Sequence, residues 1–254
     1  MGVLNITPDS FSDGGRFLDP QAAAAHARRL AAEGADILDI GAESTRPYGA
    51  VPVSGEEERA RLGPVLADVV ALGVPVSIDT MKAEVAAWAL DRGAAIVNDV
   101  WGLQRDPDMA RVAADRGAAV IIMHNRTTAD PSIDIVVDVT AFFERSLEIA
   151  IRAGVPRGRI VLDPGIGFGK TAEQSFLCIA KLEAWRSFGM PLMVGASRKR
   201  FIATVAPSDP TERLGGALAA HLFAVNNGAS IVRVHDVAAT VQALAVAAAI
   251  ERAR

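Results

Sequence analysis

The chain has 254 residues, half of them hydrophobic and 5% aromatic, with a formal net charge of −4; this suits one large α/β domain over residues 1–254. The acidic balance argues against a nucleic-acid or anionic-membrane surface, and the lone Cys178 excludes a disulfide framework and thiolate zinc sites. The sequence shows no signal-peptide pattern and no run of about 18 apolar residues, so we expect a cytoplasmic protein that does not cross a membrane.

A first strand is predicted at residues 2–6, and a repeated pattern follows it along the chain. In each copy a helix-like segment rich in Ala, Leu, Glu and Arg ends at a glycine, and a short apolar run comes next. Clear helical segments are residues 21–33, 82–92 and 140–153. Glycine suits the position after a helix because it adopts a left-handed backbone without steric cost. The glycines of the repeat are Gly34, Gly73, Gly93, Gly117, Gly154, Gly189 and Gly228.

Each apolar run is typical of a strand buried on both faces, as parallel sheets require. The copy at Gly154 is stretched, and its strand begins at Ile160. Ser54 and Glu57 predict a capping box that opens the second helix. Seven helix-to-strand junctions and the first strand make eight β-α units, which favours a closed (β/α)₈ barrel over an open doubly wound sheet.

Polar side chains follow all eight apolar runs, at the end of the strands where a barrel of this kind places its active site. Carboxylates and asparagine suit a heterocycle with N–H and amino donors, because an ionised carboxylate only accepts hydrogen bonds. Lysine, arginine and histidine suit a phosphate or carboxylate, and Thr45 and Arg46 extend that group. The ligand therefore has a donor-rich ring and an anionic end. The residues are Asn5, Asp39, Asp79, Asn98, His124, Asp163, Ser197 with Lys199, and Arg233 with His235.

Residues 163–171 nearly match a phosphate-binding loop. Pro164 stands where a Walker A motif needs glycine, and Lys170 stands where a dinucleotide motif needs one, so neither is assigned. Two interpretations of the glycines stay open: they let the backbone approach a flat ligand, or they shape a βα loop. His124 and His235 are too isolated for a zinc site, and His221 is expected to be a packed helical histidine.

Several of these segments closely resemble the dihydropteroate synthase family. They are residues 4–15 (LNITPDSFSDGG), 39–47 (DIGAESTRP), 77–80 (SIDT), 98–99, 163–170, 197–199 and 233–235. The match runs through nearly the whole chain, in order and at the predicted strand ends. The resemblance implies a homodimer that uses Mg²⁺. It also implies the condensation of 6-hydroxymethyl-7,8-dihydropterin diphosphate with 4-aminobenzoate, giving 7,8-dihydropteroate and diphosphate.

The resemblance also assigns expected roles by position. The pterin ring is expected to contact Asp79, Asn98, Asp163 and Lys199. The diphosphate is expected to contact Arg233, His235 and, through Mg²⁺, Asn5. The 4-aminobenzoate pocket is expected to include Phe11, Thr45, Arg46, Pro47 and Phe168. Participants in catalysis are expected to be Asp39, Lys199, Arg233 and His235. Asp9 and Asp39 are expected to order a loop or to stabilise charge.

The chain departs from the family pattern in three places. Family members usually carry a segment before the first strand that caps the bottom of the barrel. The loop after His124 lacks the usual glycine and proline, and the second loop carries an extra Tyr48.

Two alternatives share the pterin-binding carboxylates. A methyltetrahydrofolate:corrinoid-type methyltransferase has no use for the diphosphate group of Asn5, Arg46, Arg233 and His235. A non-catalytic pterin-binding relative would not need both that group and the loop motifs. The sequence therefore favours the synthase.

Overall fold

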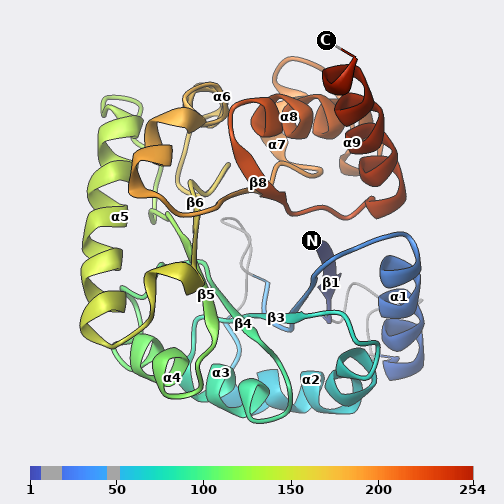
Figure 1. Ribbon diagram of the computed structural model, residues 1–254, viewed down its shortest axis with the longest axis vertical. Coiled ribbons are helices and arrows are strands. Elements are labelled where there is room, and N and C mark those ends of the chain that lie inside the picture. Colours follow the sequence, from blue (N-terminus) through green and yellow to red (C-terminus); the bar gives the residue numbers. More distant parts are fainter. Residues whose placement is uncertain (7–18, 45–51, 254) are drawn as a thin grey trace.

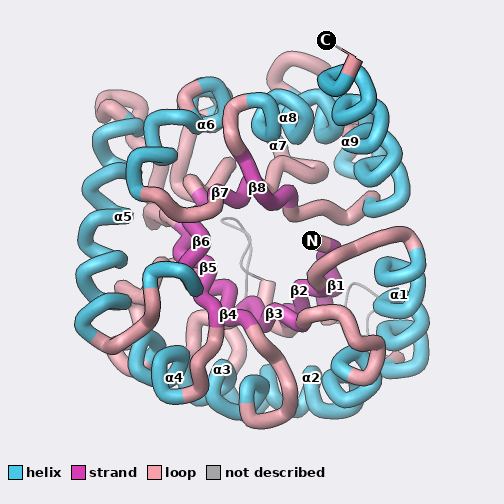
Figure 2. The backbone as a smooth tube through the Cα atoms, in the orientation of Figure 1, coloured by secondary structure: helices cyan, strands magenta, loops and turns pink. Residues whose placement is uncertain are grey.

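The computed structural model describes residues 1–6, 19–44 and 52–253. Eight parallel strands pair in chain order from β1 to β8, and helices surround them (Figures 1 and 2). The strands are β1 (Gly2–Asn5), β2 (Leu38–Gly41), β3 (Val76–Asp79), β4 (Ile96–Asp99), β5 (Ala119–Met123), β6 (Ile160–Asp163), β7 (Leu192–Val194) and β8 (Ala229–Val232). The helices are α1 (Pro20–Ala32), α2 (Gly55–Val70), α3 (Ala83–Leu90), α4 (Met109–Asp115), α5 (Ile135–Arg152), α6 (Ala172–Ala180), α7 (Arg200–Ala203), α8 (Leu214–Asn226) and α9 (Val237–Arg252).

The sheet closes on itself between its first and last strands. Gly2 forms a parallel bridge with Val234, just beyond β8. The Val3 N–H donates to the Val234 carbonyl at 2.9 Å, and the Val234 N–H donates to the Met1 carbonyl at 2.9 Å. The expected (β/α)₈ barrel is therefore confirmed.

The glycines of the sequence repeat lie where a helix turns into the following strand. All seven have a positive φ, as predicted from their positions after helices. At Gly93, φ is +101° and a β-carbon would also collide with Val70, so the turn after α3 needs glycine on two counts.

Side-chain caps fix where two of the helices begin. The Ser54 hydroxyl accepts from the Glu57 N–H at 3.1 Å, as the sequence predicts, but the Glu57 carboxylate binds Arg61 at 2.8 Å. Only half of the expected capping box is thus present. A complete box opens α6, where Thr171 and Gln174 satisfy each other's backbone N–H groups. This box anchors the end of the β6–α6 loop, which borders the site described below.

Two further side chains are packed in the interior: Cys178 and, as the sequence predicts, His221. Cys178 is fully buried, and burial raises the pKa of its thiol to about 11. His221 is 1% exposed on α8, and its Nε2 accepts from the Ala196 N–H at 3.1 Å. In the described ranges no helix has the length and apolar character needed to cross a bilayer.

Candidate functional site

The alternation of side chains along the strands places the polar groups inside the barrel. A small apolar cluster, separate from the main core, is formed by Met1, Ile121 and Met193 with Ile37, Ile96, Val161 and Ile231 packed against it. Side chains two residues apart on a strand face the same way. Asp39, Asn98, Met123, Asp163 and Arg233 each lie two residues beyond a member of this cluster. They therefore form the next layer up, at the carboxyl end of the strands.

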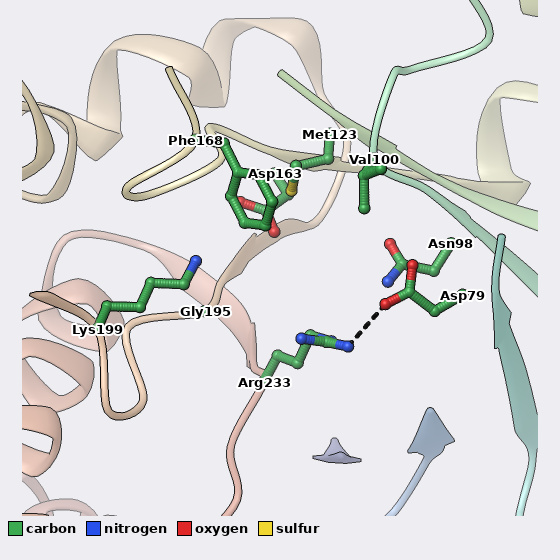
Figure 3. Close-up of a pocket in the computed structure, with 9 residues that line it drawn as sticks. All are labelled: Asp79, Asn98, Val100, Met123, Asp163, Phe168, Gly195, Lys199 and Arg233. Atoms are coloured by element: carbon green, nitrogen blue, oxygen red, sulfur yellow. Dashed lines mark hydrogen bonds and ion pairs between the residues drawn. The ribbon is translucent and has the colours of Figure 1, made fainter. Parts of the chain in front are cut away.

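A pocket opens at this layer, and its walls come from several strands and the loops that follow them (Figure 3). The lining residues are Asp79, Asn98, Val100, Met123, Asp163, Phe168, Gly195, Lys199 and Arg233. The sequence predicted site roles for six of them. It missed Val100, Met123 and Gly195. For Met123 and Gly195 the signal was the strand alternation, since they lie two residues beyond Ile121 and Met193.

One wall of the pocket is a buried cluster of acids around Arg233. Its Nε donates to Asp39 Oδ2 at 2.6 Å, and its NH2 donates to Asp79 Oδ2 at 2.9 Å. Asn98 Nδ2 lies 3.3 Å from the same Asp39 oxygen. Burial, reinforced by the charge of Asp39, raises the pKa of Asp79 to about 8. Arg233 thus bridges Asp39 and Asp79, and at pH 7 the raised pKa of Asp79 favours its protonated form.

Three oxygens of this cluster are buried without a partner among the described residues. They are Asp39 Oδ1, Asp79 Oδ1 and Asn98 Oδ1. Buried polar atoms in proteins nearly always have hydrogen-bond partners, and an unpaired one has a cost of about 1–3 kcal/mol. Two of the three belong to pocket-lining residues. The site therefore offers acceptors to a ligand that carries donors.

The facing wall is built from Asp163, Phe168 and Lys199 (Figure 3). Asp163 Oδ1 accepts from the Gly165 N–H at 2.7 Å, which ties the start of the β6–α6 loop to the strand end. Lys199 Nζ donates to the Ile166 carbonyl at 2.5 Å and lies 4.6 Å from the centre of the Phe168 ring. Burial lowers the pKa of Lys199 to about 7. This wall supplies one cation and one aromatic face.

His235 and Asn5 lie outside the set of lining residues. His235 Nδ1 is 3.0 Å from the hydroxyl of Ser197, and its backbone N–H donates to the same oxygen at 3.2 Å. Asn5 ends β1, where it pairs with Gly41, and the residue is partly exposed. Asp39 lies within β2 and reaches the pocket only through Arg233 and Asn98.

His124 does not point into the barrel, although it follows β5 directly. It is one residue out of step with Met123, so its ring faces outward, toward Asp138 and Phe142 on α5. Its place after an apolar run predicts that it belongs to the ring of polar strand ends. The alternation along the strand corrects this placement.

The glycines of the near-P-loop shape the loop itself. Gly165 has φ +66°, and a β-carbon there would run into the His124 carbonyl. Gly169 has φ +54°, and a β-carbon there would run into the backbone of Arg126. Of the two interpretations left open by the sequence, these contacts favour the shaping of a βα loop.

Several predicted residues lie outside the part of the chain that the structure describes. They are Asp9, Phe11, Thr45, Arg46, Pro47 and Tyr48. Within residues 1–6, 19–44 and 52–253, no three His, Cys, Asp or Glu side chains gather as a metal site. None of the nine lining residues is Ser, Cys or His. The described pocket walls are therefore equipped to bind and to stabilise charge, and none of their nine lining residues supplies a hydroxyl or thiol nucleophile.

Comparison with known proteins agrees with this geometry. The family described as "Pterin binding enzyme" matches residues 1–235. Dihydropteroate synthase of Bacillus subtilis is 46% identical over 93% of this chain and 83% of its own length. The Xanthomonas albilineans dihydropteroate synthase structure with 4-aminobenzoic acid is 44% identical, with a TM-score of 0.94 over 98% of this chain and 92% of that one. The Thermus thermophilus enzyme in complex with 6HMPPP is 47% identical, with a TM-score of 0.87 over 98% and 92%.

Proposed function

The chain belongs to the dihydropteroate synthase family of pterin-binding enzymes, and on that premise we propose how its residues carry out the family's reaction. The enzyme joins 6-hydroxymethyl-7,8-dihydropterin diphosphate to 4-aminobenzoate and releases diphosphate, giving 7,8-dihydropteroate. The observation that carries the assignment of roles is the pair of unpartnered oxygens, Asp79 Oδ1 and Asn98 Oδ1, at the pocket wall.

The pterin ring lies between the two walls of the pocket. Its exocyclic amine and ring N–H groups donate to oxygens of Asp79, Asn98 and Asp163, since an amide oxygen and the carbonyl oxygen of a protonated carboxyl both accept hydrogen bonds. Lys199 donates to a ring carbonyl or nitrogen from the facing side. Each unpartnered oxygen gains a donor, and the cost of leaving it unpaired is recovered when the ligand binds.

The diphosphate lies toward Arg233 and His235. Arg233 keeps its Nε and NH2 on Asp39 and Asp79, so NH1, which has no partner among the described residues, is free for a phosphate oxygen. Asn5 would hold Mg²⁺ through its amide oxygen, a ligand type that Mg²⁺ prefers, at a partly exposed position. The ion would there supply positive charge to offset the charge on the departing diphosphate.

The amine of 4-aminobenzoate is itself the nucleophile, so the reaction needs none from the protein. As the diphosphate leaves, positive charge develops on the pterin methylene carbon, and the Asp39 carboxylate stabilises it from behind Arg233 and Asn98. Phe168 forms one side of the arylamine subsite, next to Lys199. The family resemblance assigns Phe11, Thr45, Arg46 and Pro47, which lie outside the described residues, to the same subsite.

Diphosphate release by the purified protein tests this proposal. We expect release only when pterin diphosphate, 4-aminobenzoate and Mg²⁺ are all present, with dihydropteroate formed in equal amount. A protein that binds the pterin without releasing diphosphate would be a non-catalytic relative. A protein that binds methyltetrahydrofolate and transfers its methyl group to a corrinoid would be the methyltransferase.

We propose that two copies of the chain form a homodimer through the face made by α6, α8 and α9. Helix α8 lies between the other two (Figure 1). Large exposed apolar side chains gather on these helices: Phe176, Leu177, Leu214, Phe223, Val225, Val241, Val246 and Ile250. Burial of such a patch is a main driving force for stable association. Sedimentation should give twice the 26.6 kDa chain mass, and Phe223→Glu should give the monomer, whereas Val137→Glu on α5 should not.

We also place the reaction in the cytoplasm. The single thiol, Cys178, is fully buried and has no use for an oxidising compartment. Fractionation of the host cells should recover diphosphate-releasing activity with the cytoplasmic enzymes.

A further inference from the structure

Two loops at the carboxyl end of the barrel are locked together behind the pocket. The first is the β5–α5 loop, which begins at His124, and the second is the β6–α6 loop from Pro164 to Thr171. Because Gly165 and Gly169 leave no room for a β-carbon, the backbones of the two loops touch. A side chain that holds one loop therefore also acts on the other.

Lys170 is the buried link between these loops. It is 6% exposed, and its Nζ lies 2.6 Å from Nδ1 of His124 and donates to the Phe168 carbonyl at 3.2 Å. A protonated lysine only donates, so Nδ1 accepts and the proton of the neutral ring sits on Nε2. That Nε2 donates to Asp138 Oδ2 at 3.0 Å, and Arg126 donates to the same oxygen. The chain of contacts thus runs from α5 to the loop that carries Phe168.

The ionisation of both groups fits this arrangement. Burial, together with the charge of Lys170, lowers the pKa of His124 to about 3, so the ring is neutral at pH 7. Burial lowers the pKa of Lys170 to about 8, so the amine stays mostly protonated at that pH.

Phe168 is held from two sides. Lys170 binds its carbonyl from behind, while Lys199 lies against its ring from the pocket side. Lys199 also donates to Ile166, two residues earlier in the same loop. In Figure 3 the Phe168 ring stands at the pocket edge beside Asp163. A shift of the Phe168 carbonyl would therefore move the ring against which the arylamine packs.

We propose that Lys170, supported by His124, is a positioning residue for the arylamine: it fixes Phe168 without touching either substrate. This rests on the proposed role of Phe168 in the 4-aminobenzoate subsite. A displacement of about 1 Å in a positioning group can lower the rate by about 100-fold, so the hydrogen bond to one carbonyl is sufficient to matter. Of the proposed pterin contacts, Asp79 and Asn98 lie on the other wall, while Asp163 and Lys199 keep their own bonds to the Gly165 N–H and the Ile166 carbonyl, so pterin binding should be preserved.

Steady-state kinetics with Lys170→Met test the proposal. We expect KM for 4-aminobenzoate to rise by about tenfold, while the dissociation constant of the pterin diphosphate changes by less than about twofold. His124→Leu should act in the same direction, and His124→Gln, which keeps an acceptor for Lys170, should restore most of the loss. Arg157→Met is the matched control, because Arg157 donates to the Phe188 carbonyl at 3.0 Å from the opposite end of β6.

A double-mutant cycle separates positioning from general stability. Phe168→Leu should raise the same KM, and adding Lys170→Met to it should cause little further loss, whereas their effects on the free energy of unfolding should add. Additive effects on KM, or an equal loss of pterin affinity, would overturn the proposal.

Hydrogen exchange gives a readout that does not depend on activity. The Phe168 N–H donates to the Gly165 carbonyl at 3.1 Å, and we expect it to exchange faster in Lys170→Met than in the wild type. Unchanged exchange would overturn the positioning role even in a fully active enzyme. If the wild type releases no diphosphate but the Phe168 N–H still exchanges faster in Lys170→Met, the loop contact is supported and only the proposed function fails.

Discussion

The Nε of Arg233 lies 2.6 Å from Oδ2 of Asp39, a carboxylate with no exposed surface that sits 194 residues away in the sequence. This contact ties β2 to the end of β8 across the interior of the barrel. It also gives the Asp39 carboxyl a cationic partner in a place that water does not reach.

The first prediction concerns that pair. Arg233→Ala leaves the charge of Asp39 buried without compensation, and we expect the free energy of unfolding to fall by about 3–5 kcal/mol in urea titrations. Asp39→Asn in the same chain should restore part of the stability, because the uncompensated charge is gone. It should not restore diphosphate release. Equal stability of Arg233→Ala and the wild type would show that the pair does not act in this way.

The second prediction concerns Lys199, whose amine is buried at the pocket wall. Lys199→Ala removes a charge-assisted hydrogen bond to the pterin, and such bonds contribute about 1.5–3 kcal/mol. We expect pterin affinity, measured calorimetrically, and kcat/KM to fall by roughly 10- to 100-fold. Unchanged kinetics on the diphosphate substrate would refute the placement of the ring.

The third prediction concerns the metal. Chelation of Mg²⁺ with EDTA should stop diphosphate release, and added Mg²⁺ should restore it. Asn5→Ala should raise the Mg²⁺ concentration for half-maximal rate by roughly tenfold, since one oxygen ligand is lost. Asn5→Asp keeps an oxygen there and serves as the control. If Asn5→Ala has the metal dependence of the wild type, another residue binds the ion.

The fourth prediction concerns pH and His221. Burial, with a contribution from the charge of Lys199, lowers the pKa of His221 from 6.5 to about 4. Between these pH values the unfolded chain binds a proton at His221 that the folded chain does not. The contribution of His221 to the free energy of unfolding is therefore fully present above pH 6.5 and is lost as the pH falls toward 4. The contribution of His221 to the slope of the unfolding free energy against pH approaches about 1.4 kcal/mol per pH unit.

His221→Gln removes this proton and keeps an acceptor for the Ala196 N–H. In urea unfolding at pH 5, 6 and 7, the free energy of unfolding of His221→Gln should therefore fall less steeply toward acid pH than that of the wild type. Some loss of stability toward acid pH should remain in the variant, because burial also lowers the pKa of His124. Parallel curves for the two proteins would rule out His221 as a source of the acid sensitivity.

The sequence predicted the barrel well because the signals for it are local. The residue after each helix must tolerate a left-handed backbone, and a glycine such as Gly34 with φ +97° satisfies this within one turn of the chain. Carboxylates at the ends of apolar runs, such as Asp79 and Asp163, could be placed on one face once the barrel was recognised.

The remaining features of the site depend on contacts between distant parts of the chain. The polarity of His124 suggested a place in the pocket. Met123, not His124, lies two residues beyond Ile121 on the strand, and the strand alternation therefore assigns the pocket position to Met123. The 46-residue separation of Lys170 from His124 left no local pattern to find. No spacing rule predicts that Arg233 pairs with Asp39 as well as lining the pocket.

The unpartnered oxygens of Asp79 and Asn98 also govern which molecules the pocket refuses. A flat heterocycle that turns a carbonyl toward Asn98 Oδ1, where the proposed pterin pose turns a donor, would set lone pair against lone pair there. Sites built to bind polar groups discriminate against mismatched analogues by factors of about 10⁴ to 10⁵. Purine-like metabolites with the wrong edge would thus be excluded by repulsion as well as by fit. A useful inhibitor must present donors to that wall.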